Sequence, residues 1–316
     1  MPVADITVVF PYYNEAETIR TTLDLMSRQT LMPREVYFVN SSSTDGSARI
    51  VDDWIAANQP RFETKFHNVS EGTNTPSSSK NVGIRRAACD WVAFMDCGQR
   101  FPEDWLERQW AYVRSHPEVD LVSGGCVMTG EGLIDQSAVA MTSGYKAFRP
   151  CVPTSLVKKT VFDKTGPFRE NRRAGYDASW ASSLARAGVR RGINEDVVIR
   201  YLGVNYADSL SECFSKAFRY AVPMVGLPGC YTPYAYLAPL VVAASCCALH
   251  PRSFGLFLGA YVLFRGYYYP ARKSRGFALI KERKLALLTL PLTAIVIDAG
   301  RMLGYIKGII VEPWLP

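Results

Sequence analysis

The sequence has few of the residues from which metal centres and disulfide frameworks are built. Only three histidines occur among its 316 residues, and no cysteine pair has the CxxC spacing. This excludes a zinc site of the usual spacing, and in a chain of this size we expect reduced thiols in a protein that faces the cytosol. The eight cysteines are Cys89, Cys97, Cys126, Cys151, Cys213, Cys230, Cys246 and Cys247.

Three further absences narrow the classes of function. No GxGxxG fingerprint follows the first apolar run, which argues against a dinucleotide-binding dehydrogenase. No basic stretch followed by an apolar one precedes that run, so we predict that the chain has no cleaved signal peptide. The net charge of +7 does not form a stripe of cations on the first two hundred residues, and we expect no nucleic acid as a partner.

Charge is missing altogether from residues 220–249. A helix that spans a bilayer needs ~20 apolar residues. The first of three apolar segments holds Pro233 and Pro239, the second is short, and the third is interrupted by Asp298 and Arg301. We predict membrane-inserted or interfacial helices, or alternatively a hydrophobic subdomain packed against the first domain or a dimer partner. The segments are 231–249, 254–264 and 285–311.

A cluster of six cations at 272–284 lies between the second and third apolar segments. Such a cluster beside a bilayer favours contact with anionic lipids and marks the cytoplasmic side. A solvated basic loop that does not contact lipid explains the cluster equally well, and it leaves the assignment of the cytoplasmic side unchanged. The sequence therefore predicts a protein of the cytoplasmic (inner) membrane whose first domain faces the cytoplasm. The cations are Arg272, Lys273, Arg275, Lys281, Arg283 and Lys284.

The first two hundred residues alternate between strand and helix patterns. Short apolar runs rich in β-branched residues alternate with helical spacing, which predicts an α/β domain with right-handed crossovers and a mainly parallel sheet. We place this domain at residues 1–222 and the membrane-associated region at 223–316. The predicted details include a capping box from Asn14 to Glu17, an irregular region over 130–150 and a helix over 155–162.

The stretch WVAFMDCGQRFP, residues 91–102, is the centre of this prediction. Its apolar run reads as a strand buried on both faces, and it ends at Asp96. Open α/β sheets bind ligands at the carboxyl ends of their strands. Loops that follow the other strands should converge on the same edge and bring Asn40 and Lys80 towards Asp96.

Five motifs in order resemble those of family 2 glycosyltransferases, which have the GT-A nucleotide-sugar-binding fold. They are VVFPYYNE at 8–15, VNSSSTDGS at 39–47, SSSKNVGIRRA at 77–87, FMDCGQRFPEDWL at 94–106 and GPFRENRRAGYDASWASSLARAG at 166–188. The resemblance covers roughly residues 6–222, and the apolar tail is similar to that of members in bacterial surface-polysaccharide pathways. It implies inverting transfer from a nucleoside-diphosphate sugar, preferably a UDP-sugar, to a lipid-linked acceptor such as a polyprenyl-diphosphate saccharide.

The resemblance also implies where the donor binds. Pro11, Tyr12 and Glu15 would surround the base and ribose, because an aromatic ring and a carboxylate at a strand end suit both. Asn40 stands where the family has an aspartate that reads the base, and its carbonyl oxygen can accept the same hydrogen bond. Lys80 and Asn81 match a motif at a helix start, where a cation and the helix dipole favour a diphosphate.

Asp96 matches the first residue of the family's DxD metal motif, whose second aspartate is here Gly98. Because a divalent cation can be held by one carboxylate together with substrate phosphates, we predict Mg²⁺ or Mn²⁺ at Asp96, with weakened affinity. Alternatively, Lys80 or Arg100 neutralises the leaving group without a metal.

Asp177 matches the aspartate of the family's Glu-Asp motif, with Tyr176 in place of the glutamate. The resemblance makes Asp177 the base that deprotonates the acceptor hydroxyl, although the same position is compatible with a helix N-cap. Two alternatives remain open. One is a polyprenyl-phosphate glycosyltransferase, whose acceptor needs little base catalysis, and the other is a catalytically inactive GT-A module that serves as a membrane scaffold.

Overall fold

The computed structural model describes residues 1–71, 75–172, 174–201, 207–227, 241, 244–246, 248, 250, 252 and 254–311. The chain forms two compact units. The sheet unit comprises Met1–Val127 and Phe148–Gly203, and the helical unit comprises Met128–Ala147 and Val204–Pro316. The units thus divide the chain at other positions than the boundary we placed after residue 222. The assignment of a catalytic role to residues 1–222 stays a prediction.

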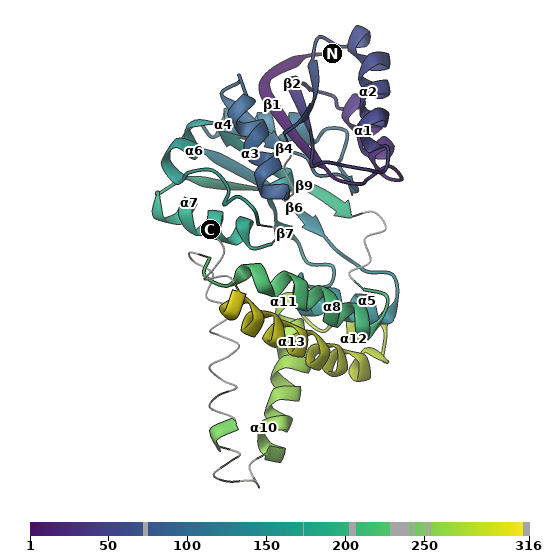
Figure 1. The fold of residues 1–316 in the computed structure, drawn as a ribbon, viewed down its shortest axis with the longest axis vertical. Helices are drawn as coiled ribbons and strands as arrows, with labels where there is room; N and C mark the ends of the chain where they lie inside the picture. Colours follow the sequence, from purple (N-terminus) through teal and green to yellow (C-terminus); the bar gives the residue numbers. More distant parts are fainter. Residues whose placement is uncertain are drawn as a thin grey trace. The chain divides into compact units, whose positions relative to one another are not determined.

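Four parallel strands form the first half of the sheet unit, in the order β3-β2-β1-β4 (Figure 1). Each crossover between them contains a helix, as the alternating pattern predicts. The elements are β1 (Val3–Tyr12), α1 (Ile19–Ser27), β2 (Met32–Asn40), α2 (Ser47–Asn58), β3 (Lys65–Ser70), α3 (Pro76–Arg86) and β4 (Trp91–Phe94).

The second half of the sheet is mixed, because β8 runs antiparallel to both β4 and β6. The predicted helix over 155–162 is therefore wrong in its first half. Leu156 and Val157 are fully buried in the sheet as part of β8, and the helix begins only at Thr160. The elements are β5 (Gln99–Arg100), α4 (Trp105–Ser115), β6 (Leu121–Val127), β7 (Arg149–Pro150), β8 (Leu156–Lys158), α6 (Thr160–Thr165), α7 (Tyr176–Arg186) and β9 (Arg191–Tyr201).

Both faces of the sheet are covered, and the side chains of β1 show how. Ile6, Val8 and Phe10 are buried in one hydrophobic cluster, whereas Val9 is buried in the other. Successive side chains of a strand point to opposite faces, so this run of apolar residues is buried on both sides. At Gly83 of α3, a Cβ atom would lie 2.4 Å from Val9 Cγ1, which means that α3 packs directly onto β1.

The loop after β1 differs from the prediction. Helix α1 begins at Ile19, not after Asn14, and Asn14 has a left-handed backbone with φ 52°. Its side-chain oxygen accepts a hydrogen bond from the Thr44 amide at 2.8 Å. The predicted capping box is therefore wrong, because Asn14 bonds to the loop after β2 and joins two loops at the carboxyl edge.

The helical unit contains a helix in the region that we predicted to be irregular: α5 spans Leu133–Thr142. Most of its side chains are buried, and α5 packs against α13. The other described elements of the unit are α8 (Leu210–Ala221), η3 (Val222–Met224), α10 (Phe254–Tyr261), the π-helix η5 (Val262–Tyr268), α11 (Tyr269–Lys273), α12 (Ala278–Glu282) and α13 (Ala286–Val311).

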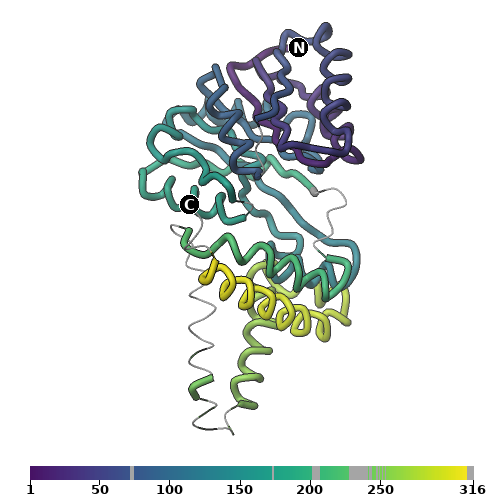
Figure 2. Tube along the Cα trace, viewed as in Figure 1, coloured from purple at the N-terminus to yellow at the C-terminus, as the bar shows by residue number. Residues whose placement is uncertain are grey.

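Helices α8 and α13 run side by side (Figure 2). Gly300, Gly304 and Gly308 line the contact at every fourth position of α13. A Cβ atom on Gly304 would lie 2.5 Å from the Phe218 carbonyl oxygen of α8. A Cβ atom on Gly300 would lie 2.6 Å from the Phe214 carbonyl oxygen of α8, and one on Gly308 would lie 2.6 Å from the Val222 carbonyl oxygen of η3. Only glycine allows the two backbones to approach this closely.

Among the described residues, α13 is the one helix that is long and apolar enough to cross a membrane. Its 26 residues continue through Asp298 and Arg301, the two charges that interrupt the apolar run of this segment in the sequence. Of the other two apolar segments, 254–264 forms α10 and the start of η5, while 231–249 lies largely outside the described residues.

Candidate active site

A buried ion pair lies at the carboxyl edge of the parallel strands, where Asp96 follows β4. The Lys80 ammonium nitrogen is 2.7 Å from Asp96 Oδ1, and the exposed fractions of the two side chains are 0% and 27%. Lys80 belongs to the second turn of α3, whose packing on β1 brings its side chain to this edge. The convergence of Lys80 and Asp96 that we predicted from the alternating pattern is thus present in the structure.

The ion pair keeps Lys80 charged. Burial alone would lower the pKa of the Lys80 ammonium, but the Asp96 carboxylate and the Tyr176 hydroxyl raise that pKa above its usual value. The Lys80 ammonium also lies 5.7 Å from the centre of the Tyr176 ring. The site therefore holds a fixed positive charge that one carboxylate balances, next to an aromatic ring.

Tyr176 and Asp177 open α7 at the same place. Gly175 precedes them with a left-handed φ of 78°, and Asp177 is exposed in the first helical turn. Burial raises the pKa of the Tyr176 hydroxyl; Lys80 opposes this, and the carboxylates of Asp96 and Asp177 reinforce it. Both carboxylates therefore act on one phenol.

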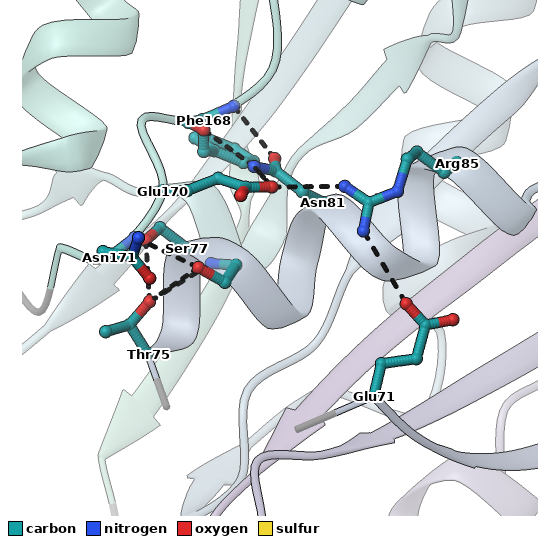
Figure 3. A network of polar contacts seen from close by, with 9 residues as sticks. Glu71, Thr75, Ser77, Asn81, Arg85, Phe168, Glu170 and Asn171 are labelled. Atoms are coloured by element: carbon teal, nitrogen blue, oxygen red, sulfur yellow. Dashed lines mark hydrogen bonds and ion pairs between the residues drawn. The ribbon is translucent and has the colours of Figure 1, made fainter. Parts of the chain in front are cut away.

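A network of hydrogen bonds fixes the loop before α7 onto α3 (Figure 3). The Asn81 side-chain nitrogen donates to the Phe168 carbonyl at 2.7 Å and to Glu170 at 3.2 Å, and its oxygen accepts from the Phe168 amide at 3.0 Å. Ser77 Oγ adds a bond of 3.0 Å to the Arg172 carbonyl. Asn81 was predicted to bind the diphosphate, but here its amide holds the loop that leads to Asp177.

The outer end of this network consists of charged residues. Arg85 lies 3.2 Å from a carboxylate oxygen of Glu170 and 3.7 Å from one of Glu71 (Figure 3). These pairs are largely exposed, so each contributes little to stability. The buried bonds of Asn81 are therefore the main attachment of the loop.

Tyr12, the last residue of β1, and Tyr13, which follows it, lie in different surroundings. Tyr12 is 3% exposed, and its hydroxyl donates to Asn68 at 2.8 Å, so its ring belongs to the core, where a base cannot stack. Tyr13 is 47% exposed and is the aromatic ring that a ligand at this edge can reach. Pro11 is buried in β1. Glu15 is half-buried, and its carboxylate accepts a hydrogen bond from Thr18.

Asn40 ends β2 and is mostly buried. Its side-chain oxygen, which we predicted to read the base, accepts a hydrogen bond from the Ser43 amide at 2.8 Å. Asp45 accepts from the Ala16 amide at 2.9 Å and from the Ser47 amide at 3.0 Å, so its carboxylate stabilises the loop locally. The structure thus brings Asn40 to the same edge, with its acceptor used locally.

A sequence profile described as glycosyl transferase family 2 matches residues 7–184, which is more than half of the chain. The chain belongs to glycosyl transferase family 2. Glycosyltransferase AglE of Haloferax volcanii is 26% identical over 224 residues, which cover 68% of this chain and 71% of AglE. The putative teichuronic acid biosynthesis glycosyltransferase TuaG of Bacillus subtilis is 24% identical over 202 residues, which cover 60% of this chain and 76% of TuaG.

The fold agrees with this assignment. The mannosyltransferase PcManGT of Pyrobaculum calidifontis, solved with GDP-Man and Mn²⁺, superposes with a TM-score of 0.58 at 21% identity, over 94% of this chain and 87% of that one. The predicted GT-A fold of this family 2 glycosyltransferase is thereby confirmed, and the chain is a glycosyltransferase.

The residues of this glycosyltransferase offer a divalent cation a single carboxylate. Gly98 has a left-handed φ of 74°, which favours glycine, and replaces the second aspartate of the metal motif. Among the described residues, no three histidine, cysteine or acidic side chains group so as to hold a metal ion. Asp96 still fits Mg²⁺ or Mn²⁺, because such ions often take one or two carboxylates and complete their shell with substrate phosphates and water.

Two features of the site were not predicted from the sequence. Tyr176 was noted only as the replacement of a glutamate, and Glu170 was not singled out; their roles depend on side chains that meet across the fold. Cys97, next to Asp96, packs its Sγ 3.8 Å from the hydroxyls of Thr18 and Thr22, and burial raises the pKa of its thiol to about 12. Cys97 is therefore a protonated packing residue at neutral pH.

Proposed function

We propose that this glycosyltransferase moves a sugar, with inversion at the anomeric carbon, from a nucleoside-diphosphate donor to a hydroxyl group of a membrane-associated acceptor. One observation carries the proposal: a fully buried ammonium, Lys80, is held 2.7 Å from Asp96 beside the helix that begins with Tyr176 and Asp177. A fixed cation suits a diphosphate leaving group, and a nearby exposed carboxylate suits a general base.

In this mechanism, the acceptor oxygen attacks the anomeric carbon while the bond from that carbon to the diphosphate oxygen breaks. Asp177 takes the proton of the acceptor hydroxyl. Lys80 stabilises the negative charge that develops on the departing diphosphate, and its fixed position means that little reorganisation is needed during the reaction. Asn81 acts indirectly, because its bonds to Phe168 hold the loop that positions Asp177.

Asp96 would hold Mg²⁺ or Mn²⁺ together with oxygens of the donor diphosphate. When bound, the ion supplies further positive charge at the leaving group. The Mn²⁺ in the mannosyltransferase PcManGT supports this role. Because Lys80 already neutralises the single negative charge of Asp96, we expect weak metal binding in the absence of the donor.

The donor base would lie against the loop after β1. We propose that Tyr13, which is exposed, stacks on the base where we had predicted Tyr12. Pro11, Glu15 and Asn40 stay in the proposed nucleotide pocket, although the Asn40 oxygen must release the Ser43 amide to read a base. A UDP-sugar remains our preferred donor.

The acceptor is proposed to be lipid-linked, with a polyprenyl-diphosphate saccharide as the model compound. Support comes from apolar side chains that are exposed on the helical unit and from the cations between α11 and α13. Such a surface suits the cytoplasmic face of an inner membrane that contains anionic lipids. The exposed apolar residues include Phe254, Leu256, Leu263, Phe264, Leu285, Leu288 and Ile310.

The test is transfer from a panel of nucleotide sugars by the full chain in detergent, with the product anomer read by NMR. We expect Asp177→Asn to lower the rate by about 10²–10⁴-fold. Asp163→Asn is the matched control, because Asp163 is also exposed in the first turn of a helix, α6, and it should leave the rate unchanged.

Other results would favour the alternatives. A rate that survives Asp177→Asn with a polyprenyl phosphate as acceptor would support a polyprenyl-phosphate glycosyltransferase, since a phosphate acceptor needs little base catalysis. Absence of both transfer and hydrolysis with every nucleotide sugar would instead support an inactive scaffold.

A further inference from the structure

One face of α13 carries large apolar side chains that the described part of the chain leaves exposed. Each is between 44% and 71% exposed. Together with the half-buried Ala299 they recur every three or four positions, so they form a continuous stripe along the helix. An exposed aliphatic surface of this length marks an interaction site. The apolar stripe consists of Leu288, Leu292, Ile295, Leu303, Ile306 and Ile310.

Another face of α13 is packed against protein. Gly300 meets the carbonyl group of Phe214 at the middle of α8, and Gly308 meets that of Val222 just beyond its end. Eight residues of α13 thus match eight residues of the neighbouring chain, so the two helices run parallel and in step. Helix α13 is therefore apolar on both faces, but only the apolar stripe is exposed.

This packing decides how α13 can meet a bilayer. If α13 crossed the membrane, α8 would be carried into the hydrocarbon beside it. Helix α8 contains Glu212 and Lys216, which form an ion pair at 2.9 Å, and the exposed Arg219. Charged side chains are rare and costly at that depth. Helix α13 therefore meets a bilayer from the side, as an interfacial helix does, with the apolar stripe towards the lipid.

Helix α10 differs from α13, because its exposed surface is apolar all round. Its eight residues include no charge, and residues 254–260 are all exposed. The helix extends away from α8 and α13 (Figure 1). At ~1.5 Å per residue it is about 12 Å long, which is less than half of the ~30 Å hydrocarbon core. Helix α10 can therefore enter one leaflet but does not by itself reach the other.

The residues that follow α10 change in character as a bilayer does from its core outwards. Phe264 and then Tyr268 are exposed in η5, and the exposed Arg272 follows in α11. Hydrocarbon, interface and anionic headgroups favour apolar, aromatic and cationic side chains respectively. Two more exposed cations, Arg283 and Lys284, directly precede α13. This order and this charge fit an anionic lipid surface better than a protein partner.

We propose that the helical unit docks on one leaflet of an anionic bilayer, with α13 along the surface through its apolar stripe and α10 inserted into the hydrocarbon. The one described helix that is long enough to cross a membrane thus does not cross it. This inference rests on the proposed function, because the docked unit would hold the enzyme at its membrane-associated acceptor.

The depth of each helix in a bilayer tests the proposal. The full chain is bound to vesicles of phosphatidylcholine and phosphatidylglycerol in equal parts, and tryptophan quenching is compared for lipids brominated near the headgroup and near the chain end. The variants are Leu288→Trp, Ile295→Trp and Leu303→Trp, each measured relative to the unaltered chain. Their positions lie about 10–12 Å apart along the helix axis. We expect equal and shallow quenching at all three, and deeper quenching for Leu256→Trp in α10.

Two results of this experiment would overturn the proposal. Deeper quenching of Ile295→Trp than of both other α13 variants would show that α13 spans the bilayer, because the middle of a spanning helix lies at the bilayer centre. No added quenching at any position would show that the surface does not meet lipid, and would favour a protein partner or a second copy of the chain.

Flotation with the same vesicles measures the contribution of the apolar stripe. Leu288→Glu should weaken vesicle binding about tenfold or more, because it removes apolar contact and adds a charge that anionic lipid repels. Leu288 is 71% exposed, so this change does not disturb the core. The matched control is Ile193→Glu in the sheet unit, where Ile193 is 51% exposed, and it should change binding less than twofold. Equal losses in the two variants would contradict the proposal.

The same variant separates this inference from the proposed reaction. Hydrolysis of the donor in detergent should be unchanged in Leu288→Glu, because the apolar stripe takes no part in the chemistry. Vesicle binding needs no turnover, so an unaltered chain that docks as expected but neither transfers nor hydrolyses any nucleotide sugar would refute the proposed function alone.

Discussion

Removal of the Asp96 charge tests the central ion pair. Lys80 is fully buried, and its ammonium lies 2.7 Å from Asp96 Oδ1, which corresponds to an attraction of roughly 6 kcal/mol at an effective dielectric constant of about 20. Desolvation of the ammonium offsets much of this attraction. When one partner of a buried pair is removed, the charge that remains typically costs about 3–5 kcal/mol. Because the Asp96 side chain is 27% exposed and water can reach it, we expect the lower end, about 3 kcal/mol, for Asp96→Asn.

The two single variants should differ. Lys80→Met leaves a carboxylate that water can still solvate, so we expect a smaller loss of about 1–2 kcal/mol. In Lys80→Met/Asp96→Asn neither charge remains, and the double variant should be more stable than the sum of the two losses indicates, by about 2 kcal/mol.

The assay is urea denaturation at neutral pH, followed by tryptophan fluorescence. Asp53→Asn serves as the control, since Asp53 pairs with Arg49 at 3.8 Å with both side chains exposed, and it should change the free energy of unfolding by less than about 0.5 kcal/mol. The reasoning would be refuted if the loss of unfolding free energy in the double variant equalled the sum of the two single losses to within about 0.5 kcal/mol. Such a result would show that the two charges do not stabilise each other.

Three further predictions concern other parts of the chain. Gly304→Leu should lower the free energy of unfolding by about 1–3 kcal/mol in a thermal melt, because its Cβ would lie 2.5 Å from the Phe218 carbonyl; Gly259→Ala, with open space around it, should not. Asn81→Ala should speed hydrogen exchange at the Phe168 amide about tenfold or more, and equal protection in both proteins would contradict the role of Asn81. The Arg190 guanidinium lowers the pKa of Asp120 from 3.8 to about 2, so its stabilisation is present above pH 4 and is lost as the pH falls towards 2. Asp120→Asn should remove this loss of stability in acid, which urea titrations at several pH values would measure. We expect the loss to be only on the order of 1 kcal/mol, because Arg190 is largely exposed and solvent screens the pair.

Much of the sheet unit could be predicted because its pattern is local. The apolar runs of β1 and β4 and the helices between them follow from residues close in sequence, and the parallel order follows from the crossovers. The short strand β8 was missed for the same reason. Leu156 and Val157 carry no local signal that separates a three-residue strand from the start of a helix, and their pairing with β4 and β6 decides the matter.

Some site residues could likewise be predicted from local sequence, whereas others depended on how the chain folds. Asp96 and Lys80 were found because each follows a recognisable strand or helix start, and the fold brings them to within a hydrogen bond of each other. Tyr12 and Tyr13 are chemically equivalent in the sequence, and either could have stacked on a base. Only the phase of β1 buries Tyr12 against Asn68 and exposes its neighbour.

The sequence by itself determined the family, the α/β pattern and the positions of the acidic and basic residues at the strand ends. The tertiary structure decided which of them meet: Lys80 with Asp96, Asn81 with Phe168, and Asp298 with Arg265. Asp298 interrupts the third apolar segment in the sequence, and within α13 it is neutralised by Arg265 of η5, 33 positions earlier. A charge in an apolar segment becomes acceptable only when a distant residue neutralises it, and residues this far apart in sequence reveal no such pairing until the chain has folded.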